Sequence, residues 1–529
     1  TQTYPNRLHL FTGCNGGGGV GGDPQMHNYG EDETPSADMA TDKPIDPKAY
    51  NWTTYAERLQ AAGIAWKVYQ EYDNFGDNLL SVFPPFRPCA EDSELYRRGR
   101  SWVSEQAQGK DRTRSDGEQL VAAFRRDIES GQLPQISWIV TAADLSEHPT
   151  AEPSKGEHVT AKLIEALVDN PDVFAKTVFI LNYDESGGFY DHVPPPVPPV
   201  GTYRGKSTVP IDGEAKDYRG SGEAGDEQHP IGFGIRVPAV IVSPWSRGGQ
   251  VCSELFDHTS VLQFMEKRFG VREPNISAWR RSVCGDLTSA FDFTGAQAMP
   301  ALSLPGTDDF RERVARSAAG TVNAIPAQQV PTMQMSGQRA HRPLPYRTAA
   351  DSRIDADGSM IIAMANNGKT GAVLTVHDNR GKEEPRHYTI GAGERIEDLW
   401  KADAFDLTLH GPNGFWRRFA GGGKDREVRL LDRPELDAVE LQLENRGTVP
   451  LTFTIALADS YLAQAARMRK VTVGPGNTVG DLWRLSKSDN WYDLSVTLVS
   501  DDAALWHYAG KVENGRPGRT DPAIGVMRV

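Results

Sequence analysis

A short apolar segment that ends in two adjacent carboxylates is the feature that most strongly limits how the first half of this chain can fold. Residues 177–181 form the continuous apolar run that a strand buried on both faces of a sheet produces. Asp184 and Glu185 follow this run, and Gly187 and Gly188 come next. Because ligands of open α/β sheets bind beyond the carboxyl ends of the strands, we expect a functional site here.

Two interpretations of the acidic pair are open at this point. The pair is either a solvated acidic turn or part of a site, because neighbouring carboxylates are costly to hold together unless a cation accompanies them. The glycine pair and the prolines at 194–196 fix the backbone on both sides and favour a site. A divalent metal ion is therefore expected beside Asp184 and Glu185.

Helical and strand-like segments alternate from residue 1 to about residue 295. Strands are expected at 64–69, 136–140, 177–181 and 237–243, and helices at 53–62, 118–130, 159–168 and 259–269. This β-α-β-α order predicts an α/β fold with a mostly parallel sheet that helices cover on both sides.

Composition sets the number of domains and excludes one class of partner. A chain of 529 residues is too long for one hydrophobic core, so roughly two to four domains are expected. The formal net charge of −14 argues against a nucleic-acid partner held by a general basic field. No apolar run approaches the ~20 residues of a membrane-spanning helix. The 4 cysteines lie far apart, and they allow one or two disulfides without requiring any.

The C-terminal third contains an internal repeat. The segments that recur are 366–368 at 445–447, 397–400 at 480–483, 405–407 at 492–494, and 419–421 at 508–510. The spacing of about 80 to 90 residues and the alternating strands at 439–443 and 451–455 predict two tandem all-β sandwich modules. The aromatic residues shared by both copies are expected to be core residues rather than ligand contacts: Trp400, Trp483, Phe419 and Tyr508.

A second candidate site residue stands at the start of the chain. Thr3 comes just before Pro5, which suits a first helical turn, and an apolar run closed by Gly13 follows. Thr3 is either the N-cap of this helix, which the sequence alone favours, or a nucleophile facing a phosphate held at the helix N-terminus. Coordination to a cation would favour the alkoxide of such a threonine.

Several ordered motifs make the chain resemble the bacterial phosphocholine-preferring phospholipase C family. They are TxPNR at 3–7 with FTG at 11–13, SEHP at 146–149, YDExxGFxDHVPPP at 183–196, FDHTS at 256–260 and WRRxxCGDL at 279–287. The resemblance extends over essentially the whole chain, including two C-terminal modules typical of that family. The family's remaining metal ligands, a Glu-Asn pair at the end of its first strand, have no counterpart here, so we expect a missing N-terminal segment.

The resemblance implies a fold similar to the acid phosphatases of the alkaline phosphatase superfamily. We expect a three-layer α/β/α catalytic domain with a mostly parallel sheet over residues 1–298. A linker rich in Ala, Gly, Gln and Ser is expected over 299–345, with a short helix near 309–317. The β-sandwich modules are then expected at 346–428 and 429–529.

The resemblance also assigns roles to particular residues. Thr3 is implied to be the nucleophile, and Thr3, Asp184 and Glu185 are implied to hold one divalent metal ion. His148 is implied to contact the phosphoryl group or to assist the leaving group. His192, and likewise His258, is a weaker catalytic candidate that a structural role explains equally well.

The implied activity is that of a metal-dependent phospholipase C. It would convert phosphatidylcholine-type lipids to diacylglycerol and phosphocholine through a phospho-threonine, in a secreted or periplasmic protein that contacts membrane surfaces transiently. A choline group would favour an aromatic cage. The candidate aromatic residues are Tyr50, Trp52, Tyr69 and Tyr72, and packing in the core is the alternative for each. Three other functions stay open: an acid phosphatase using the same site, a non-catalytic surface-binding protein that uses the β modules, and an inactive homologue.

Overall fold

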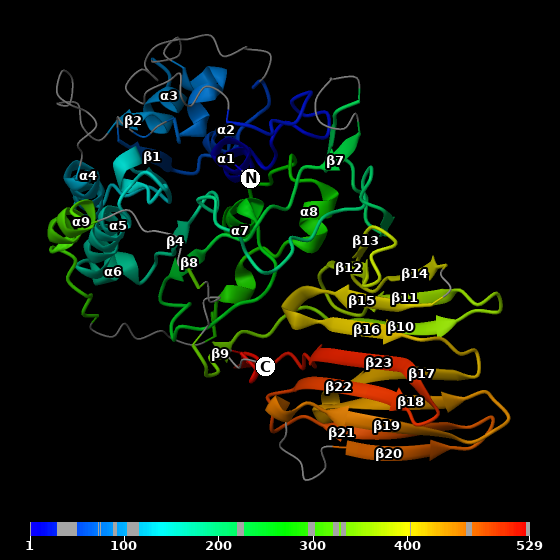
Figure 1. Ribbon diagram of the computed structural model, residues 1–529. Coiled ribbons are helices and arrows are strands. Elements are labelled where there is room, and N and C mark those ends of the chain that lie inside the picture. The colour runs from blue at the N-terminus through cyan, green and yellow to red at the C-terminus, as the bar shows by residue number, and fades with distance from the viewer. Residues whose placement is uncertain are drawn as a thin grey trace.

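A computed structural model gives the arrangement of most of the chain. It describes residues 2–28, 50–71, 74, 76–87, 92–102, 116–219, 227–294, 302–320, 327–328, 335–401, 404–461 and 468–524. Helices and short strands form the N-terminal part, and an all-β region forms the C-terminal third (Figure 1). The predicted combination of an α/β domain with a C-terminal β region is thus confirmed, whereas the three-layer arrangement stays a prediction.

A sheet of three parallel strands forms the first part of the α/β domain, in the order β2-β1-β3. Its central strand β1 (Trp66–Gln70) pairs in parallel with β2 (Ser101–Trp102) and β3 (Ile136–Val140). Helix α2 (Tyr55–Ala61) precedes β1, and α4 (Glu118–Glu129) connects β2 to β3. Elements α2, β1, α4 and β3 correspond to those predicted from the sequence, with the same or slightly shifted ends, whereas β2 was not predicted.

The strand that leads to Asp184 differs from the prediction. Strand β4 (Phe179–Asn182) is only half-buried, and it pairs antiparallel with β8 (Ala239–Val242). The expected burial on both faces is therefore wrong, because an apolar run does not by itself reveal how much of each face is covered. A parallel partner needs a crossover, usually a helix. The described residues between β4 and β8 contain only three short strands: β5 (Gly205–Ser207), β6 (Ala215–Asp217) and β7 (Gln228–Pro230).

Helices cover the α/β domain and connect it to the rest of the chain. Helix α5 (Pro153–Val168) begins earlier than expected because Pro153 suits the first helical turn. The other described α-helices are α1 (Thr3–Thr12), α3 (Glu94–Gly99), α6 (Pro171–Phe174), α7 (His258–Phe269), α8 (Ala278–Val283) and α9 (Phe310–Ala318). Helices α1 and α7 pack against each other, and α9 packs on α5. Within the described ranges, no helix is both long and apolar enough to cross a membrane.

The strands of the two C-terminal repeats follow one pattern. The first repeat contributes β10 (Thr348–Ile354), β11 (Met360–Asn366), β12 (Ala372–Asp378), β13 (Arg386–Ile390), β14 (Arg395–Trp400), β15 (Asp406–His410) and β16 (Trp416–Ala420). The second contributes β17 (Arg426–Arg433), β18 (Ala438–Asn445), β19 (Leu451–Leu457), β20 (Met468–Val473), β21 (Thr478–Arg484), β22 (Trp491–Leu498) and β23 (Asp501–Lys511).

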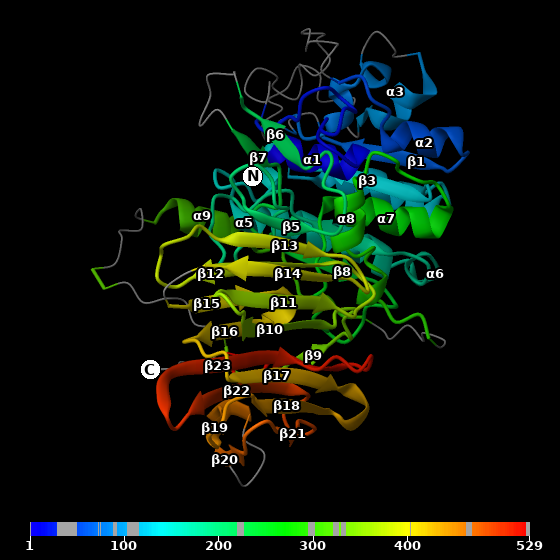
Figure 2. The same ribbon diagram turned by 90° about the vertical axis from the view of Figure 1, so that its right-hand side faces the viewer.

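Both sheets of the sandwich run through the two repeats (Figure 2). One has the order β14-β11-β10-β17-β18-β21, and the other β20-β19-β22-β23-β16-β15-β12-β13-β5. Strands β16 and β23 join the repeats in the larger sheet, and their buried side chains belong to one continuous core. The expected boundary between 428 and 429 falls inside β17, so the two modules are parts of one sandwich.

Equivalent residues of the two repeats make equivalent contacts. The shared aromatic residues are buried, which confirms their predicted core role: Trp400, Trp483, Phe419 and Tyr508. Asn366 donates hydrogen bonds to the Thr370 and Ile390 carbonyl oxygens, and Asn445 donates in the same way to those of Val449 and Val473. Each buried amide therefore closes the loop that follows the second strand of its own repeat.

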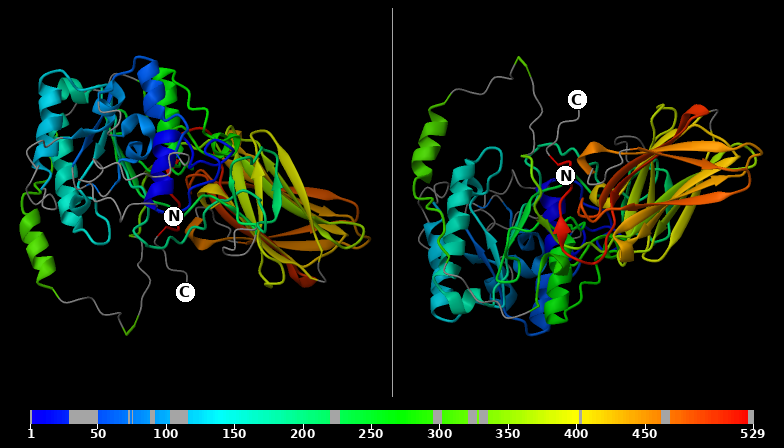
Figure 3. Two further views of the ribbon diagram at one scale, coloured as in Figure 1. Left: turned by 90° about the horizontal axis from the view of Figure 1, so that it is seen from above. Right: turned by 90° about the horizontal axis from the view of Figure 1, so that it is seen from below.

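The β region is attached to the α/β domain through strand β5, which extends the larger sheet beside β13. Trp279 on α8 also donates a 2.9 Å hydrogen bond from Nε1 to the hydroxyl of Thr389. Figure 3 shows the sandwich, yellow to red, projecting from one side of the domain, with the cyan helices on the opposite side. Cys14, Cys252 and Cys284 are free thiols, and the fourth cysteine, Cys89, lies outside the described residues.

Candidate active site

Helix α1 carries Thr3 in its first turn. The helix begins at Thr3 after Gln2, whose backbone is extended, and Gln2 is therefore the N-cap. The alternative that Thr3 is the N-cap is wrong. The Tyr4 N–H, one of the groups that a helix start leaves without an intrahelical partner, donates to Asn28 Oδ1 at 2.9 Å. Thr3 is half-buried at the positive end of the helix dipole.

The turn after β4 packs on the same helix. The Asp184 carbonyl oxygen accepts a 2.7 Å hydrogen bond from Asn6 Nδ2, and Asp184 Oδ2 accepts one of 2.9 Å from Arg7 Nε. Asn6 and Arg7 lie about one helical turn after Thr3. The structure thus brings the acidic pair to the N-terminal half of the helix that carries the threonine.

Arg7 also binds a second carboxylate, Asp77. Its Nη1 donates to the Asp77 carbonyl oxygen at 3.0 Å, and its Nη2 lies 3.1 Å from Asp77 Oδ2. Burial opposes ionisation of Asp184, but Arg7 holds the pKa of that carboxyl below its ordinary value. Burial raises the pKa of Asp77 to about 6, against the attraction of Arg7. The arginine therefore keeps the Asp184 carboxylate ionised.

The loop that carries His148 is held beside the acidic turn through Glu147. The backbone φ of Glu147 is 63°, in the left-handed region that non-glycine residues rarely adopt. Its Oε2 accepts a 2.7 Å hydrogen bond from the Tyr183 hydroxyl, next to Asp184. Such a backbone costs about 1–3 kcal/mol and persists only where surrounding contacts hold it. His148 is exposed, with Nδ1 3.0 Å from Thr150 Oγ1.

His258 lies on the other side of Asp184, as the first residue of α7. Its Nε2 is 2.9 Å from the Asp184 carbonyl oxygen, and its Nδ1 is 3.2 Å from Asn182 Nδ2. Burial lowers the pKa of His258, so the ring is neutral at pH 7. Both nitrogens have partners, as the structural alternative for this histidine requires.

The two remaining predicted residues are the half-buried Glu185 and the exposed His192. Glu185 Oε2 accepts a 2.8 Å hydrogen bond from the Gly187 N–H. The His192 side chain is 86% exposed, and its Nδ1 lies 3.2 Å from Asp191, which is itself bound by Arg236. Among the described residues, the structure does not bring His192 to the other candidate residues.

The three predicted metal ligands match a hard divalent cation in the type of their donor atoms and only partly in number. Asp184, Glu185 and Thr3 offer the oxygen atoms that such cations prefer. One oxygen of Asp184 is held by Arg7, and the described residues contain no group of three His, Cys, Asp or Glu side chains that could hold a metal ion. Because Mg²⁺ and Ca²⁺ take roughly six oxygen ligands or more, the three residues form a partial ligand set.

The aromatic residues considered for a choline cage are mostly core residues. Tyr50 and Trp52 are buried in one cluster around α1, and Tyr69 is buried in another beside α4. Tyr72 lies outside the described residues. Core packing therefore accounts for the three that the structure describes.

Sequence reasoning assigned no role to several residues that build this site. Asn6 and Arg7 were part of the TxPNR motif but had no predicted role, and Glu147 was named only in the SEHP motif that contains His148. Asp77 has no local signal, because its partner Arg7 is 70 residues away in the chain. With a hydroxyl at a helix N-terminus, an ionised carboxylate and a nearby histidine, the arrangement suits transfer of an anionic group.

Comparison with known families agrees with this chemistry. The profile of the phosphoesterase family matches residues 1–272, which places the α/β domain in the phosphoesterase class. The profile of the C-terminal domain of bacterial phospholipase C matches residues 340–422 and 426–511, one match for each repeat. The chain belongs to the bacterial phospholipase C family, whose members are phosphoric diester hydrolases.

Curated relatives support the same assignment over nearly the whole chain. A non-hemolytic phospholipase C of Pseudomonas aeruginosa is 40% identical over 99% of this chain and 74% of its own length. A non-hemolytic phospholipase C of Burkholderia pseudomallei is 36% identical over 99% of this chain and 75% of its own length. The hemolytic phospholipase C of Pseudomonas aeruginosa is 35% identical over 99% of this chain and 75% of its own length.

Proposed function

We propose that this protein is a metal-dependent phospholipase C that cleaves the glycerol-phosphate bond of phosphatidylcholine-type lipids, releasing diacylglycerol and phosphocholine. The observation that carries the proposal is the packing of Asp184 against Asn6 and Arg7, on the helix whose first turn holds Thr3. This packing is what holds the acidic pair near the helix that carries the candidate nucleophile.

The first step is transfer of the phosphocholine group to the enzyme. Thr3 Oγ gives up its proton to solvent and attacks phosphorus as the bond from phosphorus to the glycerol oxygen breaks, and the departing oxygen takes a proton from His148. The N-terminus of α1 stabilises the negative charge on the phosphoryl oxygens through its helix dipole. Thr3 then carries phosphocholine as an ester, and diacylglycerol has left.

The second step returns Thr3 to its hydroxyl form. Water attacks phosphorus, the bond from phosphorus to Thr3 Oγ breaks, and that oxygen takes up a proton from solvent. His148, neutral after the first step, accepts a proton from the attacking water. Phosphocholine is the second product.

A single divalent metal ion belongs to this proposal, held by Asp184, Glu185 and Thr3 together with ligands that the described residues do not supply. When bound, it would neutralise charge on the phosphoryl group and lower the pKa of the attacking hydroxyl. Arg7 would keep Asp184 ionised and therefore able to serve as a ligand. The catalytic domain would then have the three-layer architecture of the alkaline phosphatase superfamily.

Transient contact with a membrane surface also belongs to the proposal. Phe189 is 76% exposed and Tyr190 is 95% exposed, directly after the acidic turn. Large aromatic side chains at the rim of a site are suited to the interfacial zone of a bilayer, where a ring has both apolar and polar surroundings. A secreted or periplasmic location would give these side chains access to lipid.

Parallel assays with two substrates test the proposed function. The purified protein is incubated with phosphatidylcholine vesicles and, separately, with a soluble phosphate monoester, with and without a chelator. We expect release of phosphocholine and diacylglycerol that chelation stops and a divalent cation restores. Faster hydrolysis of the monoester would indicate an acid phosphatase instead. A folded protein that binds vesicles without hydrolysing either substrate would indicate a surface-binding protein.

A further inference from the structure

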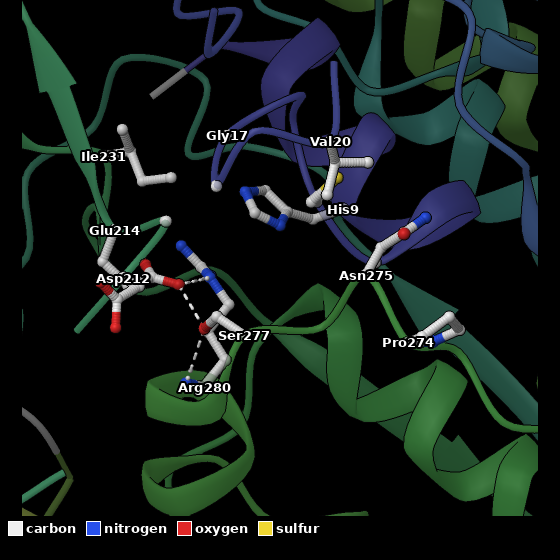
Figure 4. A pocket seen from close by; sticks show the side chains of 14 residues that line it. His9, Gly17, Val20, Asp212, Glu214, Ile231, Pro274, Asn275, Ser277 and Arg280 are labelled. Carbon is white, nitrogen blue, oxygen red and sulfur yellow. Dashed lines mark hydrogen bonds and ion pairs between the residues drawn. The ribbon is translucent and has the colours of Figure 1, made fainter. Parts of the chain in front are cut away.

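A cavity of about 140 Å³ lies beside the candidate active site but shares none of its candidate residues (Figure 4). Its walls come from α1, from the glycine-rich loop after that helix, from the turn before β6 and from α8. Figure 4 shows His9 beside Gly17 and Val20 of the loop, with Glu214 and Arg280 facing them across the space. The volume accommodates a few non-hydrogen atoms or several waters.

The polar wall of the cavity is a buried ion cluster. Glu214 Oε1 accepts hydrogen bonds from Arg280 Nε at 3.0 Å and from the Ser277 hydroxyl at 2.5 Å. Arg280 Nη1 donates to Asp257 Oδ2 at 2.7 Å. A single guanidinium therefore serves two carboxylates, and the cluster carries one excess negative charge whenever both carboxylates are ionised.

Two buried polar atoms at the cavity have no partner among the described residues. They are Glu214 Oε2 and His9 Nδ1, in side chains of residues that are 1% and 6% exposed. Burial, with Arg280 nearby, holds the pKa of His9 well below its ordinary value, so the imidazole does not supply the balancing charge. Leaving such atoms unpaired costs about 1–3 kcal/mol each, more for a charged group.

Glycines allow the loop after α1 to lie close to the turn before β6, on the other side of the cavity. A Cβ on Gly17 would lie 2.9 Å from the carbonyl oxygen of Gly213, and one on Gly18 would lie 3.3 Å from the Gly213 Cα. The backbone of the loop therefore approaches the turn before β6 more closely than a chain with side chains at these positions would allow. The close approach of the two backbone segments therefore shapes this side of the cavity.

We infer that this cavity binds the primary ammonium group of a small organic amine. The N–H groups of an ammonium would donate to Glu214 Oε2 and to an acceptor nitrogen of neutral His9, and its charge would balance the excess carboxylate. Burial raises the pKa of Glu214, and a bound cation would favour the ionised form of this group. This site is separate from the proposed catalytic one. Failure of amine binding would therefore leave the proposed phospholipase activity unaffected, and loss of that activity would leave the amine site unaffected.

Other occupants fit less well. Water would satisfy the hydrogen bonds, but the charge would then be removed only by protonation of Glu214, whose pKa burial raises. A quaternary ammonium has no N–H group to donate, and an anion would meet Glu214 and, at the mouth, the exposed carboxylate of Asp212. The described residues offer no three His, Cys, Asp or Glu side chains placed for a metal ion.

Titration of the full chain with matched cations tests the inference. Methylammonium and ethanolamine are compared with tetramethylammonium and choline at equal ionic strength, by calorimetry and by the melting temperature. The primary amines are expected to bind saturably and to raise the melting temperature, because a ligand of the native state alone stabilises it. Binding of glycerophosphoethanolamine as well would identify a lipid headgroup as the source, and binding of free amines only would identify a soluble amine.

Three variants locate the site. Glu214→Gln keeps the shape and is expected to weaken amine binding about tenfold or more. Val20→Phe fills the cavity without touching Glu214 and is expected to abolish binding. Asp212→Asn, at the exposed mouth, is the control and should change affinity less than about threefold. If circular dichroism shows that Glu214→Gln does not fold, the affinity of the Val20→Phe variant tests the location of the site.

The inference is overturned if no primary amine binds saturably, which would leave ordered water only. Equal binding of choline and tetramethylammonium would overturn it as well, because their quaternary nitrogens have no N–H group to donate to Glu214. Unchanged affinity in a folded Val20→Phe variant would place the amine elsewhere on the protein.

Discussion

Replacing Arg280 should destabilise the α/β domain more than replacing any surface arginine. In Arg280→Met, the carboxylates of Glu214 and Asp257 lose the cation that lies 3.0 Å and 2.7 Å from them. Their side chains are only 1% and 7% exposed, so water does not replace the guanidinium. Breaking a buried ion pair by removing one partner costs about 3–5 kcal/mol. For a large domain, that corresponds to a melting temperature lower by about 6–10 °C.

The same arginine bears on the candidate site through Asp257. The Asp257 side chain caps α7 with a 3.0 Å hydrogen bond from the Thr259 N–H, and the next residue, His258, contacts Asp184. Loss of Arg280 should therefore lower turnover by more than the fraction of unfolded protein accounts for. Arg280 acts through Asp257 and is a positioning residue.

Thermal unfolding followed by the helical circular dichroism signal measures the effect on the correct domain, because the described α-helices all lie outside the sandwich. Arg311→Met is the matched control, since Arg311 is 64% exposed and its ion pairs are worth about 0–1 kcal/mol. Adding Glu214→Gln and Asp257→Asn to Arg280→Met should recover most of the stability, because no buried charge is then left unpaired. A loss below about 1 kcal/mol in Arg280→Met would refute the argument.

Three further predictions concern other parts of the molecule. Tyr183→Phe removes the donor to Glu147 and should cost about 1–3 kcal/mol in unfolding free energy and loosen the His148 loop; unchanged stability and turnover would contradict this role. Serine in place of both Phe189 and Tyr190 should lower hydrolysis of vesicles while leaving a monomeric short-chain substrate unaffected, and equal losses on both would argue against membrane contact. Burial raises the pKa of Asp351 to about 6, so the folded sandwich binds this proton more tightly than the unfolded chain. Its unfolding free energy should fall by up to about 3 kcal/mol between pH 4 and 6, and Asp351→Asn should flatten that slope.

The repeat was the part of the fold that the sequence predicted best. Packing residues such as Trp400 and Trp483 recur because each copy must fill the same layer of a core, and this constraint is visible in one chain. How the copies join was not visible. The pairing of β16 with β23 depends on which edges meet, and periodicity within a strand carries no information on its neighbour.

The candidate site was predicted unevenly for a similar reason. Asp184 and Thr3 stand at the ends of elements that hydrophobic pattern and helix-start signals reveal. The N-cap role of Thr3 failed because it depended on the conformation of one residue, and helix ends are the least certain feature of a sequence-based assignment. The bridge from Arg7 to Asp77 joins side chains far apart in the chain, and only the folded structure brings them together.

Trapping of the covalent intermediate tests the central claim most directly. The enzyme is mixed with phosphatidylcholine, quenched in acid within the first turnover, digested and examined by mass spectrometry, with Thr3→Ala as control. The account predicts phosphocholine attached to the peptide that contains Thr3, and turnover reduced about a thousandfold or more in a folded Thr3→Ala protein. Phosphocholine on another residue, or substantial turnover by Thr3→Ala, would contradict it.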